Sequence, residues 1–330
     1  MGHLSIGAMC VLALAGVALD ALLGEPRRAH PLIAFGRLAT RLERAMNPDR
    51  DAMSSSGGAI GRRRAFVALK RRGIGVAAWM AAVVPPVAIA VVLTRSLPAA
   101  LAWPLHALAL WFALGGRSLA DHIAPVEDAL RARDLVRARE LTSRVVTRDL
   151  SDADVPAIAR AAIESALENG NDAVFGALFW FAVAGGGGAL AFRLANTLDA
   201  MWGYRTARFI DFGWAAARLD DVANYLPARL TAFTYALCGD VRTAFDCWRT
   251  QAHRWESPNA GPVMASGAGS LNVSCGGAAR YHGVDELRPV LGAGCPPGAR
   301  DVGRALRLVR RSLAVWLAVF ALSAFISIIV

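Results

Sequence analysis

Four apolar stretches, each close to the length needed to cross a bilayer, set the strongest limit on how this chain can fold. They cover residues 4–23, 74–94, 99–116 and 312–330. A membrane-spanning helix needs about 20 predominantly apolar residues. Because lipid offers no partner to backbone polar groups, such stretches satisfy those groups internally as helices. The sequence therefore predicts an all-α, multi-pass helical membrane protein that also carries a cytoplasmic helical lobe.

The composition agrees with membrane embedding. Of the 330 residues, 55% are hydrophobic and 19% are charged, and the net charge is +10. Soluble globular domains are about 25% charged. Arginines concentrate between the first two apolar stretches and just before the last one. By the positive-inside rule, both of these arginine-rich segments should face the cytoplasm.

This orientation divides the chain into three parts. Residues 1–116 form an N-terminal membrane region with about three spans and a basic cytoplasmic loop at 24–73. Residues 117–311 form a region on the cytoplasmic face, and residues 312–330 form a C-terminal span. Residues 173–192 are a fifth apolar candidate, for which a buried soluble helix, a re-entrant segment and a true span remain open. We favour four spans, because a lone crossing there would turn the last arginines outward.

Local patterns in the cytoplasmic-face region predict further elements. Residues 121–150 suit one or two amphipathic helices. Asp154 can cap the helix that follows, with Pro156 in its first turn. Residues 256–303 are rich in Gly, Pro, Ser and Ala. That composition fits an ordered loop region or one that handles phosphate, and both alternatives stay open.

Three acidic side chains stand at four-residue spacing directly before the fifth apolar segment. Glu164, Glu168 and Asp172 would share one face of a helix. Like charges at this spacing repel, so the stack becomes favourable when it binds Mg²⁺, a cationic amine or arginines from elsewhere. The alternative is an acidic face in water, although such a face seldom continues into an apolar run such as FGALFWF.

A second polar block, between residues 196 and 230, interleaves acids, amides and arginines with aromatic residues. Arginine suits bidentate binding of phosphate or carboxylate, and neighbouring carboxylates suit Mg²⁺. A salt-bridged pair of surface helices and a binding site fit the block equally well. The candidate residues of the second interpretation are Asn196, Asp199, Tyr204, Arg205, Arg208, Arg218, Asp220, Asp221, Asn224 and Arg229.

Residue usage argues against several function classes. Lys70 is the only lysine, so the chain contains no P-loop motif GxxxxGK[ST]. The five cysteines form no CxxC and no His-paired zinc spacing, and we expect no structural metal. Matching numbers of acids and arginines in the second polar block argue against a polyanion groove, so we expect no nucleic-acid partner.

Four blocks of sequence carry a resemblance to a known family. In chain order they are DALLGEPRRAHPLIAFGRL, RDLSDADVPAIARAAIESALENGNDAVFGALFW, NTLDAMWGYRTARFIDFGWAAARLDDVANYLPARLTA, and SPNAG followed by GAARYHG. The third block is long and unusual in composition, and together the blocks span nearly the whole chain. The chain resembles the CobD/CbiB family of cobalamin biosynthesis, the adenosylcobinamide-phosphate synthases.

The resemblance implies a carbon–nitrogen ligase of the cell inner membrane, multi-pass, with its catalytic face cytoplasmic. Such an enzyme joins the corrinoid adenosylcobyric acid to (R)-1-aminopropan-2-ol phosphate, or to aminopropanol, and gives adenosylcobinamide phosphate. ATP serves as co-substrate and Mg²⁺ as its metal. Membrane lipid and other enzymes of the cobalamin pathway are further expected partners.

The resemblance also implies roles for the polar blocks. The acids expected to act in catalysis are Glu164, Glu168, Asp172, Asp220 and Asp221. The candidate Mg²⁺ ligands among them are Glu164, Glu168 and Asp220. Asn259 of the SPNAG block joins the substrate- and phosphate-binding residues. We expect the corrinoid ring to rest against Phe179, Trp180 and Phe181.

Two other function classes fit parts of the pattern. A non-catalytic membrane sensor of the distantly similar AmpE-like type would need neither ATP nor intact polar blocks. A transporter would use Asp20, within the first apolar stretch, together with broken helices near the membrane midplane. A transporter also predicts pseudo-symmetric halves, which this sequence does not show.

Overall fold

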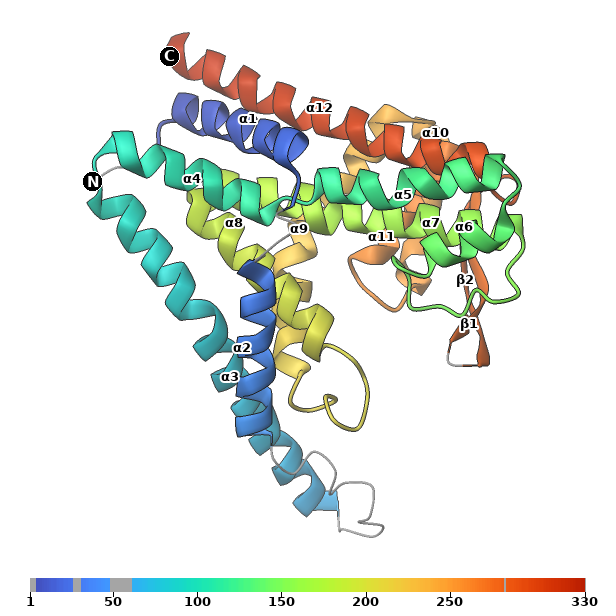
Figure 1. Ribbon diagram of the computed structural model, residues 1–330, viewed down its shortest axis with the longest axis horizontal. Coiled ribbons are helices and arrows are strands. Elements are labelled where there is room, and N and C mark those ends of the chain that lie inside the picture. Colours follow the sequence, from blue (N-terminus) through green and yellow to red (C-terminus); the bar gives the residue numbers. More distant parts are fainter. Residues whose placement is uncertain (1–3, 26–30, 48–60, 282, 330) are drawn as a thin grey trace.

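The computed structural model describes residues 4–25, 31–47, 61–281 and 283–329 (Figure 1). Its α-helices are α1 (Ile6–Leu23), α2 (Pro31–Met46), α3 (Gly61–Ser96), α4 (Ala99–Ala113), α5 (Gly116–Arg131), α6 (Leu135–Thr142), α7 (Val155–Gly170), α8 (Gly176–Trp202), α9 (Trp214–Cys238), α10 (Val241–Gln251), α11 (Ala260–Leu271) and α12 (Ala299–Ile329). The shorter elements are the π-helical turn η2 (Asn171–Phe175), the 3₁₀ turn η3 (Ala252–Arg254) and the strands β1 (Ser274–Tyr281) and β2 (Val284–Gly292). The strands pair as one antiparallel hairpin, so the fold is mostly α-helical, as predicted.

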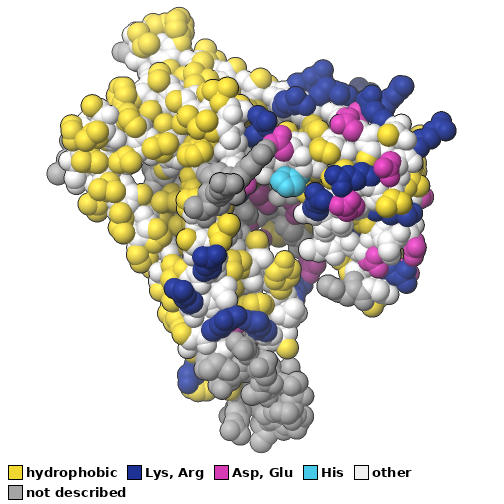
Figure 2. Space-filling view, in the orientation of Figure 1, with side chains coloured by type: hydrophobic (Ala, Val, Ile, Leu, Met, Phe, Trp, Pro, Cys, Tyr) yellow, Lys and Arg dark blue, Asp and Glu magenta, His cyan; other side chains and the backbone are white. Residues whose placement is uncertain are grey.

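Within the described residues, five helical segments are long and apolar enough to cross a membrane, judged by length and composition. They are Ile6–Leu23, Ala65–Ser96, Ala99–Arg131, Val155–Trp202 and Ala299–Ile329. Figure 2 shows apolar side chains over the end of the molecule formed by α1, α4 and the C-terminal halves of α3 and α12, while charged side chains gather at the opposite end and toward the lower tip. The structure thus confirms a helical membrane protein. The number of crossings and the three-part division stay predictions.

The α8 segment turns back on itself. Its backbone leaves helical geometry at Ala184 (φ −138°, ψ 18°) and Gly185 (φ 61°, ψ −152°). A Cβ placed on Gly188 would lie 2.3 Å from the carbonyl oxygen of Trp180. A continuous helix rises about 1.5 Å per residue, which would hold these two positions far apart. The two halves of α8 therefore form a helical hairpin, and glycine is required where they touch.

The tip of this helical hairpin is enclosed by other helices. The Gly186 N–H donates to Nδ1 of His106 on α4 at 2.9 Å. A Cβ on Gly187 would lie 2.7 Å from Val91 of α3. At membrane depth, non-helical backbone is tolerated only where protein groups satisfy it. The hairpin has the geometry of a re-entrant segment, one of the three alternatives for 173–192, and its depth in a bilayer stays a prediction.

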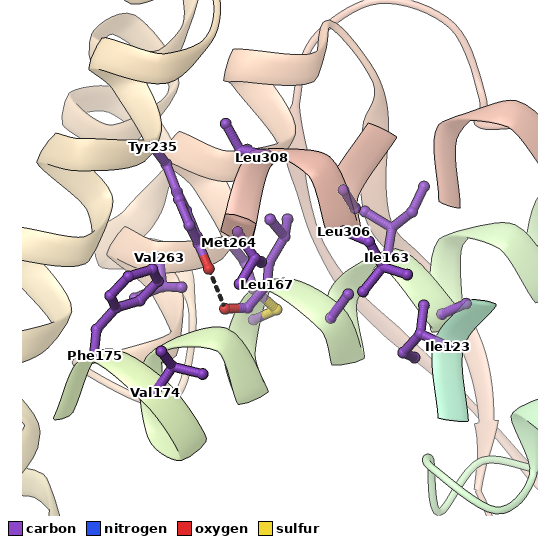
Figure 3. Close-up of a cluster of buried hydrophobic side chains, with 14 of the residues drawn as sticks. Ile123, Ile163, Leu167, Val174, Phe175, Tyr235, Val263, Met264, Leu306 and Leu308 are labelled. Carbon is purple, nitrogen blue, oxygen red and sulfur yellow. Dashed lines mark hydrogen bonds between the residues drawn. The ribbon is translucent and has the colours of Figure 1, made fainter. Parts of the chain in front are cut away.

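Buried side chains of α7, η2, α9, α11 and α12 form one continuous core (Figure 3). The Tyr235 hydroxyl donates to the Leu167 carbonyl oxygen at the end of α7, at 3.0 Å. The Phe175 ring lies 6.0 Å from the Tyr235 ring and 5.4 Å from the Trp316 ring, measured between centroids. These contacts fix η2 against α9 and α12, and the polar residues next to η2 are positioned with it.

Some local predictions are confirmed and one region differs. Helices α5 and α6 occupy most of 121–150, and Asp154 caps α7 by accepting from the Ala157 N–H at 2.9 Å. The predicted cytoplasmic loop 24–73 contains α2 and the first turns of α3, so its described part is largely helical. Residues 256–303, expected to form a loop region, hold α11, the β-hairpin and the start of α12.

Close packing explains why α11 resembled a loop in sequence. Every residue of this helix, AGPVMASGAGSL, is buried. A Cβ on Gly267 would lie 2.7 Å from the Leu167 side chain, and one on Gly269 would lie 2.9 Å from the Ala244 backbone. The small residues therefore allow neighbouring helices to approach closely rather than giving the chain freedom to bend.

Gly188→Ala should destabilise the protein by about 1–3 kcal/mol or more, because the new methyl group overlaps the Trp180 carbonyl in the hairpin. Thermal unfolding of detergent-solubilised protein measures the effect. Gly73→Ala on α3 is the matched control, since a Cβ there meets nothing within 4 Å. Equal unfolding temperatures for the two variants would contradict the hairpin geometry.

Candidate active site

A cavity of about 520 Å³ opens where α7, η2, α8 and α9 converge. Two loops complete its wall, 203–213 after α8 and 255–259 before α11. The predicted site residues that line it are Glu168, Asp172, Asp199, Tyr204, Arg205, Arg218, Asp220, Asp221, Asn224 and Asn259. The structure thus brings most of the two polar blocks and the SPNAG block into one site.

Four carboxylates from four different elements line this cavity: Glu168 on α7, Asp172 on η2, Asp199 on α8 and Asp220 on α9. In the part of the chain that the structure describes, none of the four forms an ion pair. No three described His, Cys, Asp or Glu side chains are close enough to form a ready-made metal site. Four carboxyl groups therefore converge in the cavity, and no cationic side chain among the described residues pairs directly with any of them.

A chain of amide hydrogen bonds positions two of the carboxylates. Asn171, at the start of η2, donates to Asp172 Oδ1 at 2.9 Å and to Asn224 Oδ1 at 2.8 Å. Asn224 in turn donates to Asp220 Oδ2 at 3.1 Å. The Thr231 hydroxyl donates to Asn171 Oδ1 at 2.9 Å and fixes the orientation of that amide. π-Helical turns occur frequently at functional sites, and here the turn brings Asn171 and Asp172 to α9.

Burial makes the α9 acids weaker than free aspartic acid. Burial raises the pKa of Asp220 to about 6, although hydrogen bonds from Asn224 and Asn196 lower it. Burial likewise raises the pKa of Asp221, and the adjacent Arg218, 3.2 Å away, acts in the opposite direction. Asp220 therefore changes its protonation state close to neutral pH, which is the range in which a carboxylate exchanges protons with a substrate.

Ion pairs and hydrogen bonds join the two loops at the mouth of the cavity. Arg205 of the first loop pairs with Glu256 of the second, and both side chains are exposed. Arg229 donates to Asn259 Oδ1 at 2.7 Å, and Asn259 donates to the Asp221 carbonyl at 2.8 Å. Arg229 thereby anchors the SPN segment onto α9, just outside the cavity wall.

Comparison with known proteins assigns this architecture to a family. The family model described as CobD/Cbib protein matches residues 13–309. The chain belongs to the CobD/CbiB family. Curated relatives named "Cobalamin biosynthesis protein CobD" are 55% identical over 301 residues in Stutzerimonas stutzeri and 52% identical over 300 residues in Chromobacterium violaceum. These alignments cover 91% of this chain and 93% and 92% of the respective relatives.

A third relative of the same name, from Mycobacterium tuberculosis, is 40% identical over 304 residues, which is 90% of each chain. No solved structure matches the chain. Membership of the CobD/CbiB family and these relatives support a biosynthetic enzyme role in cobalamin synthesis.

In this CobD/CbiB protein, Glu164 lies apart from the other predicted acids. Its Oε1 accepts the Gly276 N–H at 2.7 Å, and its Oε2 accepts from Arg148 and from Arg288, the latter at 3.0 Å. Arg148 also donates to the Tyr281 hydroxyl at 3.0 Å. Both carboxylate oxygens are engaged, and Glu164 is 1% exposed. We therefore reassign Glu164 from the predicted catalytic and Mg²⁺-binding residues to an ion-pair cluster that holds the β-hairpin on α7.

Arg208 also lies outside the cavity. Its Nε donates at 3.0 Å to Glu43, a buried residue of α2, and Asn47 donates to its carbonyl oxygen at 3.1 Å. The predicted phosphate-binding role does not fit this position. Arg208 instead fastens α2 to the 203–213 loop.

The aromatic run of α8 does not form the open platform that we expected for a corrinoid ring. Phe181 is fully buried in the main core. Trp180 is partly buried, and its indole N–H donates to the Ala223 carbonyl of α9 at 2.9 Å. Phe179 is partly buried and meets the Trp180 ring edge-on, with centroids 5.5 Å apart. The first half of α8 therefore uses these rings for packing.

The sequence interpretation omitted several residues that shape the cavity. Asn171 lies between two predicted acids, and its place in that run was the available signal. Trp255, Glu256 and Ser257 also line the cavity, directly before the predicted Asn259. Their contribution depends on the loop folding over α9, which no local pattern indicates.

Glu164→Ala should lower the free energy of unfolding by about 3–5 kcal/mol, because two arginines lose their buried counter-charge. Denaturant unfolding in detergent measures the loss. Glu140→Ala is the control, since its half-exposed pairs with Arg137 and Arg144 should contribute about 0–1 kcal/mol. A loss no larger than that of the control would show that the cluster is not structural.

Proposed function

We propose that this protein is an ATP-dependent carbon–nitrogen ligase, an adenosylcobinamide-phosphate synthase. It would join adenosylcobyric acid to (R)-1-aminopropan-2-ol phosphate, or to aminopropanol, through an amide bond. The supporting observation is the cavity in which Glu168, Asp172, Asp199 and Asp220 converge without an ion pair, beside arginines at the mouth. A site of this charge suits a cationic amine approaching a phosphate-activated acid.

The chemistry follows from the reactivity of a carboxylate. A free propionate is a poor electrophile, so its oxygen first attacks the γ-phosphorus of ATP, which gives an acyl phosphate and ADP. The amine nitrogen then attacks the acyl carbon, the C–N bond forms, and inorganic phosphate leaves. An ammonium ion has no lone pair, so the amine must lose a proton before it attacks. The site therefore needs an ammonium-binding surface and a proton acceptor.

The cavity carboxylates supply both requirements. Asp172 and Asp220 are held in place by the Asn171–Asn224 amide pair and can accept hydrogen bonds from an ammonium group. Asp220 is our candidate for the proton acceptor, because burial raises its pKa to about 6 and brings its basicity closer to neutral pH. Glu168 and Asp199 would contribute negative charge that favours the cationic amine.

Arginines and a divalent cation would bind the phosphate groups. Arg205 and Arg218 line the cavity near its mouth and suit phosphate or carboxylate oxygens. Mg²⁺ is usually bound through one or two carboxylates plus substrate phosphates, so Glu168 would fit it without a ready-made three-residue cluster, and Asp220 would stay free to accept the proton. When bound, Mg²⁺ would shield the charge of the ATP phosphates.

The size of the cavity bears on how the corrinoid would bind. Pockets that enclose drug-sized ligands measure about 300–1,000 Å³, and this cavity of about 520 Å³ is small for a whole corrinoid. The propionate arm would enter while the ring stays outside, beside membrane lipid. We place the protein in the inner membrane with this mouth on the cytoplasmic side, where other enzymes of the pathway could deliver substrate.

Purified, detergent-solubilised protein should form the amide and release ADP only when adenosylcobyric acid, ATP, Mg²⁺ and the amine are all present. Mass spectrometry detects the product. Asp172→Asn and Asp220→Asn should each lower the rate by about 10²–10⁴-fold, the usual contribution of acid–base groups. Asp246→Asn, an exposed residue of α10, should retain the wild-type rate. Wild-type rates in both cavity variants would rule out this site.

The rate should rise with pH through about 6 and level off above it, because Asp220 must be ionised to accept a proton. Stability responds in the opposite sense. The Asp220 carboxyl binds its proton more tightly in the folded protein than in the unfolded chain. Its contribution to the free energy of unfolding is therefore fully present below the pKa of the unfolded chain, and it is lost as pH rises through about 6. A pH–rate profile with parallel melting curves separates the two effects. An unchanged acidic limb in active Asp220→Asn protein would assign the limb to another group.

A further inference from the structure

A second, smaller cavity, of about 220 Å³, lies near the start of the polar face of α7. The 148–153 loop, α7 and the two strands of the β-hairpin line it. Its wall thus combines the RDLSDA segment with the GAARY segment, two blocks singled out in the sequence that the first cavity does not use. Four arginines line it: Arg148, Arg160, Arg280 and Arg288.

The interior of this cavity carries an excess of positive charge. The side chains of Arg148 and Arg288 are each 12% exposed, and both bind the carboxylate of Glu164, which is 1% exposed. Arg160 is a third, partly buried guanidinium on the same wall. Three positive charges therefore face one buried negative charge. Two positive charges remain for a ligand or solvent to balance.

The acids of this cavity lie at its rim and do not supply that balance. Three acids line the cavity. Asp149 is exposed, and its carboxylate accepts the Ser151 N–H at 3.0 Å. The Asp152 side chain is 89% exposed and the Asp285 side chain is 80% exposed. Both contact the exposed Arg280 only at long range, at 4.0 and 3.7 Å. Charges this exposed are screened by water and salt.

Two buried guanidinium donors in the cavity wall have no acceptor. Among the residues that the structure describes, the Arg160 side chain makes no hydrogen bond or ion pair, and its Nε is buried without a partner. The Nη2 of Arg288 is also buried without a partner, while its Nη1 and Nε bind Glu164 and the Gly277 carbonyl. Buried charged donors are costly to leave unpaired. Their presence indicates that an acceptor belongs between them.

We propose that this cavity is a binding site for a phosphoryl group, held by Arg160 and Arg288. A phosphate monoester carries a charge of about −1.5 to −2 at neutral pH, which matches the excess of two positive charges. Guanidinium groups bind phosphate oxygens through paired N–H donors. The volume is below the range of pockets that enclose whole ligands, so one phosphoryl group enters rather than a nucleoside or corrinoid.

The position of this phosphoryl site relative to the first cavity suggests its use. The Arg288 guanidinium stacks on the ring of Trp255 at 5.3 Å, and Trp255 lines the carboxylate cavity. On α7, Arg160 and Glu168 stand on the same helical face, two turns apart. A substrate phosphate held by Arg160 would thus lie near the proposed amide-forming site. The proposed function enters this inference at one point, the choice of ATP and aminopropanol phosphate as the organic phosphates to be tested.

Thermal unfolding of the full-length protein in detergent tests the site with inorganic phosphate, ATP, aminopropanol phosphate and aminopropanol. A ligand that binds the folded state raises the unfolding temperature with concentration. We expect the three phosphate compounds to stabilise the protein through Arg160, and any stabilisation by aminopropanol to be the same in the wild type and in Arg160→Gln. The tightest of the three identifies whether nucleotide, phosphorylated amine or free phosphate is the natural source.

Arg160→Gln should weaken phosphate binding by at least about tenfold, as expected for loss of charge-assisted hydrogen bonds. Without ligand it should melt at or above the wild-type temperature, because Arg160 has no partner to lose. Arg160→Lys keeps the charge without the paired donors and should bind with intermediate affinity. Arg137→Gln, which removes an exposed arginine paired with Glu140, should bind phosphate as the wild type does.

Three results would overturn the phosphoryl site. They are wild-type phosphate affinity in Arg160→Gln, unfolding of that variant without ligand, and equal weakening in Arg137→Gln. Asp220→Asn should leave phosphate binding unchanged, because Asp220 lies in the other cavity. Wild-type protein that binds phosphate through Arg160 but forms no amide product would therefore count against the proposed function alone.

Discussion

The reversal of α8 at Gly185 is the constraint on which the carboxylate cavity depends. Asp172 precedes the helical hairpin and Asp199 follows it, so only a chain that turns back brings both to the same wall. Two close contacts allow the reversal, Gly188 against the Trp180 carbonyl and the Gly186 N–H bonded to His106. The apolar hairpin thus positions the acids at its two ends, because its packed helices hold both side chains at the cavity wall.

Three charged residues at four-residue spacing on α7, Arg160, Glu164 and Glu168, have different surroundings. Arg160 stands near the start of the helix, Glu164 is neutralised by two arginines, and Glu168 faces the carboxylate cavity. Acids near a helix C-terminus oppose the helix dipole, so Glu168 gains nothing from its own helix. Carboxyl groups without an ion pair in one cavity and buried guanidinium donors without an acceptor in the next, among the described residues, give α7 two neighbouring sites of opposite preference.

Sequence reasoning could find the site because its residues are concentrated in blocks with a recognisable composition. It could not separate Glu164 from Glu168, since the two acids have the same spacing and the same local context. The partners that distinguish them, Gly276 and Arg288, come from a hairpin more than a hundred positions away. The length of the apolar stretches predicted the helices, because a chain that crosses lipid must satisfy its own backbone hydrogen bonds. Ion-pair partners, by contrast, are set by tertiary packing alone.

The same limit explains α11 and η2. In the sequence, Gly267 and Gly269 resemble loop glycines. The folded structure shows that they lack a side chain because neighbouring helices contact their backbone directly. The π-helical turn at Asn171 shifts the register of the acidic ladder by a fraction of a turn. Helical spacing therefore predicted a shared face for the three acids, and the turn redirects Asp172 toward α9.

The pair formed by Arg205 and Glu256 joins two loops across the cavity mouth, with both side chains largely in water. An exposed ion pair contributes about 0–1 kcal/mol and weakens as salt increases. The two loops are thus joined at the mouth by an interaction that thermal motion breaks readily, unlike the buried pairs that hold the β-hairpin and α2. The two loops at the entrance can therefore separate more readily than the helices that carry the cavity carboxylates.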